Sequence, residues 1–251
     1  MKPPQNCNFI SSYDGTTQTY LLDVPDQHPP RGIVVYLHGA GSNQDQGMDE
    51  QIFNGTFGWC RQWLYEKGWV YACPEYRGKD SWMNQSAEAD VTQLITLLHK
   101  QFKISKLILS GGSMGGTSAF IYAVRNPRMI GGVIAFCPAT DMADLYRFWG
   151  NYQAGIDSIL AGYGGTPSEK PEIYSERCSY AQAEKLKGLP VYLSHGSEDA
   201  AIPVGHSRRM AEALKKYSVD FCYEEIPGGS HDAPINKVFS EKAFLWMMEK
   251  L

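Results

Sequence analysis

The chain has 251 residues, of which 43% are hydrophobic and 20% are charged, and its formal net charge at pH 7 is −4. This length suits one α/β domain, and the composition is ordinary for a globular protein with a sizeable core. The slightly acidic balance provides no basic footprint for nucleic acid. No stretch approaches the roughly 18 consecutive apolar residues that a membrane-spanning helix needs. We therefore expect a single domain over residues 1–251 that binds neither nucleic acid nor a membrane.

The start of the chain and its cysteines bear on cellular location and on metal binding. No apolar signal region follows the amino terminus, which favours a cytoplasmic protein, although a chain that has lost a secretion signal would look the same. The six cysteines are scattered, without a C-x-x-C pair or a Cys/His cluster with zinc spacing. We expect reduced thiols and no metal site. The sequence does not indicate an oligomeric state.

Along the chain, short apolar strands alternate with amphipathic helices. An amino-terminal hairpin over residues 7–24, turning at Asp14-Gly15, precedes this alternation. The expected strands are 32–37, 69–74, 106–110, 131–137, 189–194 and 219–226, and the expected helices are 57–67, 86–102, 117–124, 204–217 and 235–251. Such alternation predicts a mostly parallel, doubly wound sheet with helices on both faces.

The segment 141–187 interrupts this alternation. It separates two expected strands and carries seven aromatic residues: Tyr146, Phe148, Trp149, Tyr152, Tyr163, Tyr174 and Tyr180. A connection this long in a compact domain is usually a functional insertion or a lid. We predict a short cap insertion over the strand ends. The alternative is an ordinary helix and loop packed over the sheet.

The expected strand at 106–110 runs into a glycine-rich turn around one serine. Gly111-x-Ser113-x-Gly115 is the G-x-S-x-G pattern of a nucleophile elbow, and the strand before it and helix after it are the context that this motif requires. A serine on such a sharp turn has a strained backbone, and side chains two residues away on either side would collide with the neighbouring strand and helix. The pattern predicts that Ser113 is a nucleophile at a helix N-terminus.

A serine nucleophile needs a base and a group that orients the base. In open parallel sheets such groups gather at the carboxyl ends of the strands. The strand at 189–194 is followed by Glu198 and Asp199, and the strand at 219–226 by His231 and Asp232. The chain order Ser113, Asp199, His231 is that of α/β hydrolases. The other histidines, His28, His38, His99, His195 and His206, are interpreted as structural or solvated.

Four motifs resemble those of α/β-hydrolase-fold serine hydrolases over roughly residues 32–251. They are Gly-Gly-Ser-Met-Gly-Gly at 111–116, His-Gly-Ser-Glu-Asp followed by Ile-Pro within 195–203, Gly-Gly-Ser-His at 228–231, and Tyr-Arg-Gly at 76–78. The resemblance is to the branch that includes the prolyl oligopeptidase catalytic domain and dienelactone-hydrolase-like esterases. It implies an α/β-hydrolase fold and places the acid at Asp199. No β-propeller precedes the hydrolase region, so we do not expect the gated oligopeptidase architecture.

The geometry of a nucleophile elbow also predicts the groups that receive the oxyanion. One donor is the backbone N–H of Met114, the residue after the nucleophile, and the second comes from the loop after residue 37, with Ala40 favoured. Trp82, Trp149 and Tyr152 are the predicted substrate-binding residues. They would line an apolar pocket or stack on a sugar, unless they belong to the core of the cap.

The predicted reaction is hydrolysis of a small carboxylic ester through an acyl-enzyme, with no metal or organic cofactor. Acetyl or hydroxycinnamoyl esters linked to carbohydrate are the leading substrate class. A serine peptidase that cleaves short peptides is the second hypothesis, because the motifs resemble that branch equally. A hydrolase-fold binding protein without turnover is the third, and the complete Ser/His/Asp set argues against it.

Overall fold

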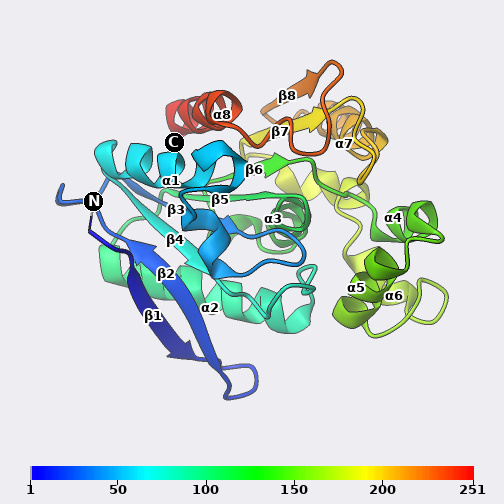
Figure 1. Cartoon of the computed structure of the whole chain (residues 1–251), viewed down its shortest axis with the longest axis horizontal. Helices are drawn as coiled ribbons and strands as arrows, with labels where there is room; N and C mark the ends of the chain where they lie inside the picture. Colours follow the sequence, from blue (N-terminus) through cyan, green and yellow to red (C-terminus); the bar gives the residue numbers. More distant parts are fainter. Residues whose placement is uncertain (1) are drawn as a thin grey trace.

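The computed structural model describes residues 2–251, which contain an eight-stranded sheet of order β1-β2-β4-β3-β5-β6-β7-β8 (Figure 1). The strands are β1 (Gln5–Ile10), β2 (Thr17–Asp23), β3 (Gly32–Leu37), β4 (Trp69–Pro74), β5 (Leu107–Gly112), β6 (Gly132–Phe136), β7 (Val191–Gly196) and β8 (Phe221–Ile226). β1 and β2 form the predicted antiparallel hairpin, and β2 is antiparallel to β4. All pairs from β4 to β8 are parallel. The predicted fold, a mostly parallel sheet with an N-terminal hairpin, is confirmed.

Helices cover both faces of this sheet. They are α1 (Ile52–Glu66), α2 (Gln85–Phe102), α3 (Met114–Arg125), α4 (Met142–Trp149), α5 (Gln153–Tyr163), α6 (Pro171–Glu176), α7 (Gly205–Lys216) and α8 (Lys237–Lys250), with 3₁₀ turns η1 (Gln44–Met48), η2 (Pro127–Met129) and η3 (Tyr180–Leu186). α1 and α8 lie on one face, and α2 lies on the other (Figure 1). None of the helices between residues 2 and 251 is both long and apolar enough to cross a membrane.

The central strands are buried along their whole length because both faces are covered. Successive side chains of a strand point to opposite faces, so each strand contributes to two separate cores. In β3, Ile33, Val35 and Leu37 pack in the core beneath α2 and α3. Val34 and Tyr36 pack in the core beneath α1 and α8. This layering holds the carboxyl end of β5, where Ser113 follows, between two packed layers.

The start of helix α1 differs from the sequence prediction. We expected a helix from residue 57, whereas α1 begins at Ile52, with Phe53, Asn54 and Gly55 in the left-handed region at φ of 49°, 54° and 71°. The side chain of Asp49 accepts hydrogen bonds from the amides of Gln51 and Ile52. Regular helical geometry begins only after Gly55, which is close to the start predicted at residue 57.

The segment 141–187 folds into α4, α5, α6 and the 3₁₀ turn η3. In Figure 1, α4, α5 and α6 form a group of their own at one end of the molecule. The side chain of Asp141 caps α4 by accepting hydrogen bonds from the amides of Ala143 and Asp144. The segment is thus a compact helical group between β6 and β7. That it acts as a cap within a single domain stays a prediction.

Candidate active site

Ser113 lies in the sharp turn between β5 and α3. Its backbone has φ 56° and ψ −122°, a strained conformation for a residue with a side chain. A Cβ on Gly111 would lie 2.4 Å from the backbone carbon of Gly115, and a Cβ on Gly115 would lie 2.0 Å from the carbonyl oxygen of Leu37. Only glycine fits at either position. The turn therefore has the geometry that the G-x-S-x-G pattern predicts.

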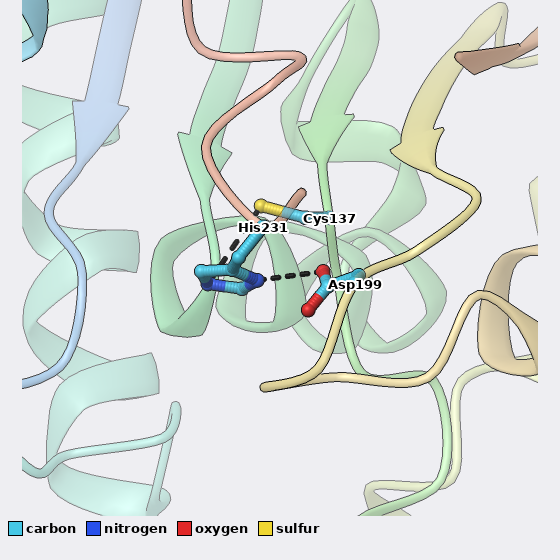
Figure 2. Close-up of side chains that lie close together, drawn as sticks. All are labelled: Cys137, Asp199 and His231. Carbon is cyan, nitrogen blue, oxygen red and sulfur yellow. Dashed lines mark hydrogen bonds and ion pairs between the residues drawn. The ribbon is translucent and has the colours of Figure 1, made fainter. Parts of the chain in front are cut away.

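Three side chains from distant parts of the chain form a continuous hydrogen-bonded row. His231 Nε2 lies 2.9 Å from Ser113 Oγ, and His231 Nδ1 lies 2.6 Å from Asp199 Oδ2. Ser113 follows β5, Asp199 follows β7, and His231 lies in the loop after β8. Figure 2 shows the imidazole of His231 beside the carboxylate of Asp199. The structure thus brings together the three residues predicted to form the triad.

The carboxylate of Asp199 is held from several sides. Its Oδ1 accepts hydrogen bonds from the amides of Ala201 (2.8 Å) and Ile202 (2.9 Å). Its Oδ2 also lies 3.0 Å from Nε2 of the fully buried His195, whose Nδ1 is 2.6 Å from the hydroxyl of Ser207. His195 therefore braces the acid, in line with the structural role predicted for it.

The two rival carboxylates lie elsewhere. Glu198 and Asp232 are exposed, and neither makes a hydrogen bond to His231 among residues 2–251. The alternatives to Asp199 at the position of the acid therefore lack the required contact.

These contacts set the charges of the site. Burial would raise the pKa of the Asp199 carboxyl, but hydrogen bonds from His195 and His231 hold this pKa well below its usual range. Burial would lower the pKa of His231, but the hydrogen bond to Asp199 and the neighbouring Cys137 outweigh it and raise this pKa to about 10. Asp199 thus stabilises the imidazolium that forms when His231 accepts a proton.

Cys137 is a neighbour of His231 that the sequence analysis did not single out. Its buried Sγ lies 4.0 Å from His231 Nε2, and its backbone is in the left-handed region at φ 43°. Ligand atoms of Cys137, Asp199 and His231 lie within 4.8 Å of one another, a spacing that a metal ion could use (Figure 2). Both ring nitrogens of His231 already have hydrogen-bond partners, as do both oxygens of Asp199. We interpret the cluster as a proton-transfer chain with an adjacent thiol.

Two backbone amides are positioned to receive an oxyanion. Met114 is the first residue of α3, so its N–H has no acceptor within the helix. In the loop after β3, the amide of Gly39 donates to Gln46 Oε1 and the amide of Gly41 donates to the carbonyl of Lys79. Within the described chain, the amide of Ala40 donates to no acceptor. The amide of Ala40 is therefore open to a ligand, and its role as an oxyanion donor stays a prediction.

Two cavities meet at Ser113 and Ala40. The larger, of about 700 Å³, extends toward α4 and α5, and the smaller, of about 230 Å³, lies against His231 and the start of α1. The larger cavity is lined by Ala40, Gly41, Asp80, Trp82, Ser113, Phe148, Trp149, Tyr152, Ala154, Gly155, Ser158, Ala200, Ala201 and Ile202. His231 lines only the smaller one. The three residues predicted to bind substrate thus border the same cavity as the serine, although Trp82 is only 1% exposed and packs mainly in the core.

The aromatic residues of 141–187 divide between the cavity and the core. Trp149 packs edge-on against Trp82 and against Tyr152, with ring centroids 5.9 and 5.7 Å apart. Tyr163 and Tyr174 are instead buried and pack against each other with centroids 5.0 Å apart. Trp149 and Tyr152 thus line the cavity, whereas Tyr163 and Tyr174 belong to the core; that the first two bind substrate stays a prediction. The sequence analysis missed Asp80 and Ser158 as lining residues, because nothing in a polar loop or a helix marks them.

The fold and the row of serine, histidine and carboxylate define a serine hydrolase with the α/β-hydrolase fold. The model of the prolyl oligopeptidase family matches residues 55–247. The chain belongs to this family, and the resemblance found in its motifs is confirmed.

Two relatives of known sequence, both named as uncharacterized, match a large part of this chain. An uncharacterized secreted protein of Arthroderma benhamiae is 26% identical over 79% of this chain and 21% of its own length. The uncharacterized peptidase YtmA of Bacillus subtilis is 26% identical over 60% of each chain. The chain thus spans less than two thirds of both relatives. Since one relative is named as secreted, the cytoplasmic location stays a prediction.

A solved structure with a similar fold is an S-formylglutathione hydrolase from Agrobacterium tumefaciens. It superposes with a TM-score of 0.73 at 18% identity, over 99% of this chain and 95% of its own. At this identity the similarity concerns the fold alone. The comparisons therefore establish the family and the fold, and they leave open the choice between ester and peptide.

Proposed function

We propose that the protein hydrolyses carboxylic esters through an acyl-enzyme on Ser113. The observation that carries this proposal is the hydrogen-bonded row from Ser113 through His231 to Asp199, placed where two cavities meet. A serine with such a base, a free pair of amides beside it and room on either side has what acyl transfer needs.

The reaction would run in two halves. His231 Nε2 takes the proton of Ser113 Oγ as this oxygen attacks the ester carbonyl, and the amides of Ala40 and Met114 donate to the oxyanion. His231 then gives the proton to the leaving alkoxide as the C–O bond breaks, which frees the alcohol. Water, deprotonated by His231, attacks the acyl-enzyme in the same way and releases the carboxylic acid and the Ser113 hydroxyl.

The positions of the cavities support one placement of the two parts of the substrate. His231 must reach the leaving oxygen, and it lines the smaller cavity, so the leaving group belongs there. The acyl group then occupies the larger cavity among Trp82, Trp149 and Tyr152. A volume of about 700 Å³ suits a large ligand and far exceeds an acetyl group. Of the two acyl classes predicted, this favours one of hydroxycinnamoyl size.

An ester is favoured over a peptide by the lining of the larger cavity. Its walls are mainly aromatic rings and small apolar side chains, with few polar groups to hold an extended peptide backbone. The test compares p-nitrophenyl esters of graded acyl size with aminoacyl p-nitroanilides under the same conditions. We expect turnover of bulky aryl esters and none of the anilides. Anilide turnover alone would identify a peptidase, and no turnover of either would support a binding protein.

Tyr152 and Trp149 are expected to set the choice of acyl group. Tyr152 is 59% exposed and lines the cavity, so Tyr152→Ala removes a ring from the acyl site at little cost to the fold. We expect the ratio of kcat/KM for bulky over small acyl esters to fall by about 10- to 200-fold. Trp149 also donates from Nε1 to the carbonyl of Ala201 (2.8 Å), so Trp149→Ala should in addition lower the melting temperature.

The matched control is Tyr13→Ala. Tyr13 is 48% exposed in the amino-terminal hairpin turn and lies outside both cavities. The Tyr13→Ala variant should leave the ratio of kcat/KM for bulky over small acyl esters unchanged. If Tyr152→Ala lowers turnover of all esters equally together with the melting temperature, the ring belongs to the core of the helical group and not to an acyl site.

A further inference from the structure

The larger cavity contains one carboxylate besides its apolar walls. Among its lining residues in the described chain, Asp80 is the only one whose side chain carries a formal charge. It lies in the loop between β4 and α2 and faces Trp82 from the same loop and Ser158 from α5. The aromatic rings of Phe148, Trp149 and Tyr152 line the same space.

One oxygen of Asp80 has a structural role. Trp82 Nε1 donates to Ser158 Oγ (2.8 Å), and Ser158 Oγ in turn donates to Asp80 Oδ1 (2.6 Å). This chain of donors links the loop after β4 to α5. It requires only an acceptor at Oδ1, which the neutral side chain of asparagine would provide equally well.

The second oxygen of Asp80 has no such role. Within residues 2–251, no hydrogen bond or ion pair reaches Oδ2, and Asp80 forms no salt bridge with any lysine or arginine. Asp80 is partly exposed and lines the cavity, so this second oxygen is open to a cationic group of a ligand. The faces of aromatic rings attract cations as well. The carboxylate of Asp80 and the aromatic rings that line the cavity therefore both favour a cationic ligand.

We propose that the larger cavity binds an acyl group that ends in a cationic nitrogen, which pairs with Asp80 Oδ2 and packs against the aromatic rings. This inference rests on the proposed function, because it assigns the charge of the acyl group that is transferred to Ser113. The acyl group inferred here has the size of a hydroxycinnamoyl group, but it carries a cation where that group has its phenol. Asp80 is then a specificity-determining residue, apart from the Ser113, His231 and Asp199 row.

The test uses two p-nitrophenyl esters of nearly identical shape. One carries 4-(trimethylammonio)cinnamate and the other 4-tert-butylcinnamate, so the acyl groups differ in charge and hardly in volume. Asp80→Asn keeps the acceptor for Ser158 and removes only the charge. We expect the ratio of kcat/KM for the cationic over the neutral ester to fall about tenfold in this variant. Comparing ratios between proteins cancels the different chemical reactivity of the two esters.

The matched control is Asp157→Asn. Asp157 is exposed on α5 next to Ser158 and does not line the cavity, so it removes the same charge nearby. In the Asp157→Asn variant, the ratio of kcat/KM for the cationic over the neutral ester should change by less than about twofold. An unchanged ratio in Asp80→Asn, or an equal loss for both esters, would show that Asp80 only braces the loop and would overturn the inference.

A binding measurement separates this inference from the proposed function. If the wild-type protein hydrolyses neither ester, the proposed function fails. Titration calorimetry of phenyltrimethylammonium with the Ser113→Ala protein then tests Asp80 without any turnover. We expect about tenfold weaker binding when Asp80→Asn is added. Equal affinity of the two proteins would overturn the assignment of a cation to this cavity.

Discussion

Replacing Ser113 by alanine is expected to abolish labelling by a fluorophosphonate probe and to lower turnover by ~10⁴-fold or more. The hydroxyl of Ser113 is the one that His231 Nε2 contacts, at 2.9 Å. Without it, no acyl-enzyme forms, whereas the helix packing around the turn is unchanged. The measurement combines probe labelling with ester turnover, and a thermal melt shows that the variant is folded.

A control for the labelling is Ser230→Ala. Ser230 is exposed and precedes His231, so it is the serine next to the proposed base in sequence. This variant should be labelled as fast as the wild type. If the Ser113→Ala protein were labelled at another serine, the assignment of the nucleophile would be wrong.

Replacing Asp199 by asparagine is expected to cost roughly 10⁴-fold in turnover while folding is retained. The amide group can donate to His231 Nδ1, which would leave the proton on Nε2 and block that nitrogen as a base. The change also acts on the pH profile, because Asp199 raises the pKa of His231. His231 must be neutral to accept a proton, so wild-type kcat/KM should fall as pH drops through a midpoint above about 6.5, the ordinary value for imidazole.

In Asp199→Asn this midpoint should move to lower pH, since the charge that stabilised the imidazolium is gone. Glu198→Gln and Asp232→Asn serve as controls, because both carboxylates are exposed and neither contacts His231. They should keep turnover near the wild-type value. Full activity of Asp199→Asn, with loss in either control, would assign the acid to that neighbour.

Much of the site follows from short sequence segments because local geometry determines them. The close contacts at Gly111 and Gly115 leave no room for a side chain, so the elbow is visible as a pattern of glycines. The positions of Asp199 and His231 after their strands follow from the rule that parallel strands end at one edge. The family membership and the fold agree with these inferences.

Other parts of the site depend on contacts between distant segments. Asp80 reaches the larger cavity because the loop after β4 contacts α5. A contact of this kind leaves no pattern of apolar residues in the sequence from which it could be predicted. Cys137 lies in an apolar strand end and looks like an ordinary core residue, yet its turn to φ 43° directs it to His231. The division of the aromatics between cavity and core likewise depends on how α4, α5 and α6 pack. The sequence shows that the segment is rich in aromatic residues, but not which of them line the cavity and which are buried in the core.

An acyl-enzyme on Ser113 would fix the order of events, and the two cavities that meet there would give each product a side of its own. In the proposed reaction the alcohol would leave the smaller cavity, beside His231, while the acyl group would stay bound among the rings of the larger one. Water can then enter from the vacated side without any movement of the acyl group. The alcohol is therefore the first product and the acid the second, which gives ping-pong kinetics. Another small alcohol that fills the vacated side would compete with water and receive the acyl group.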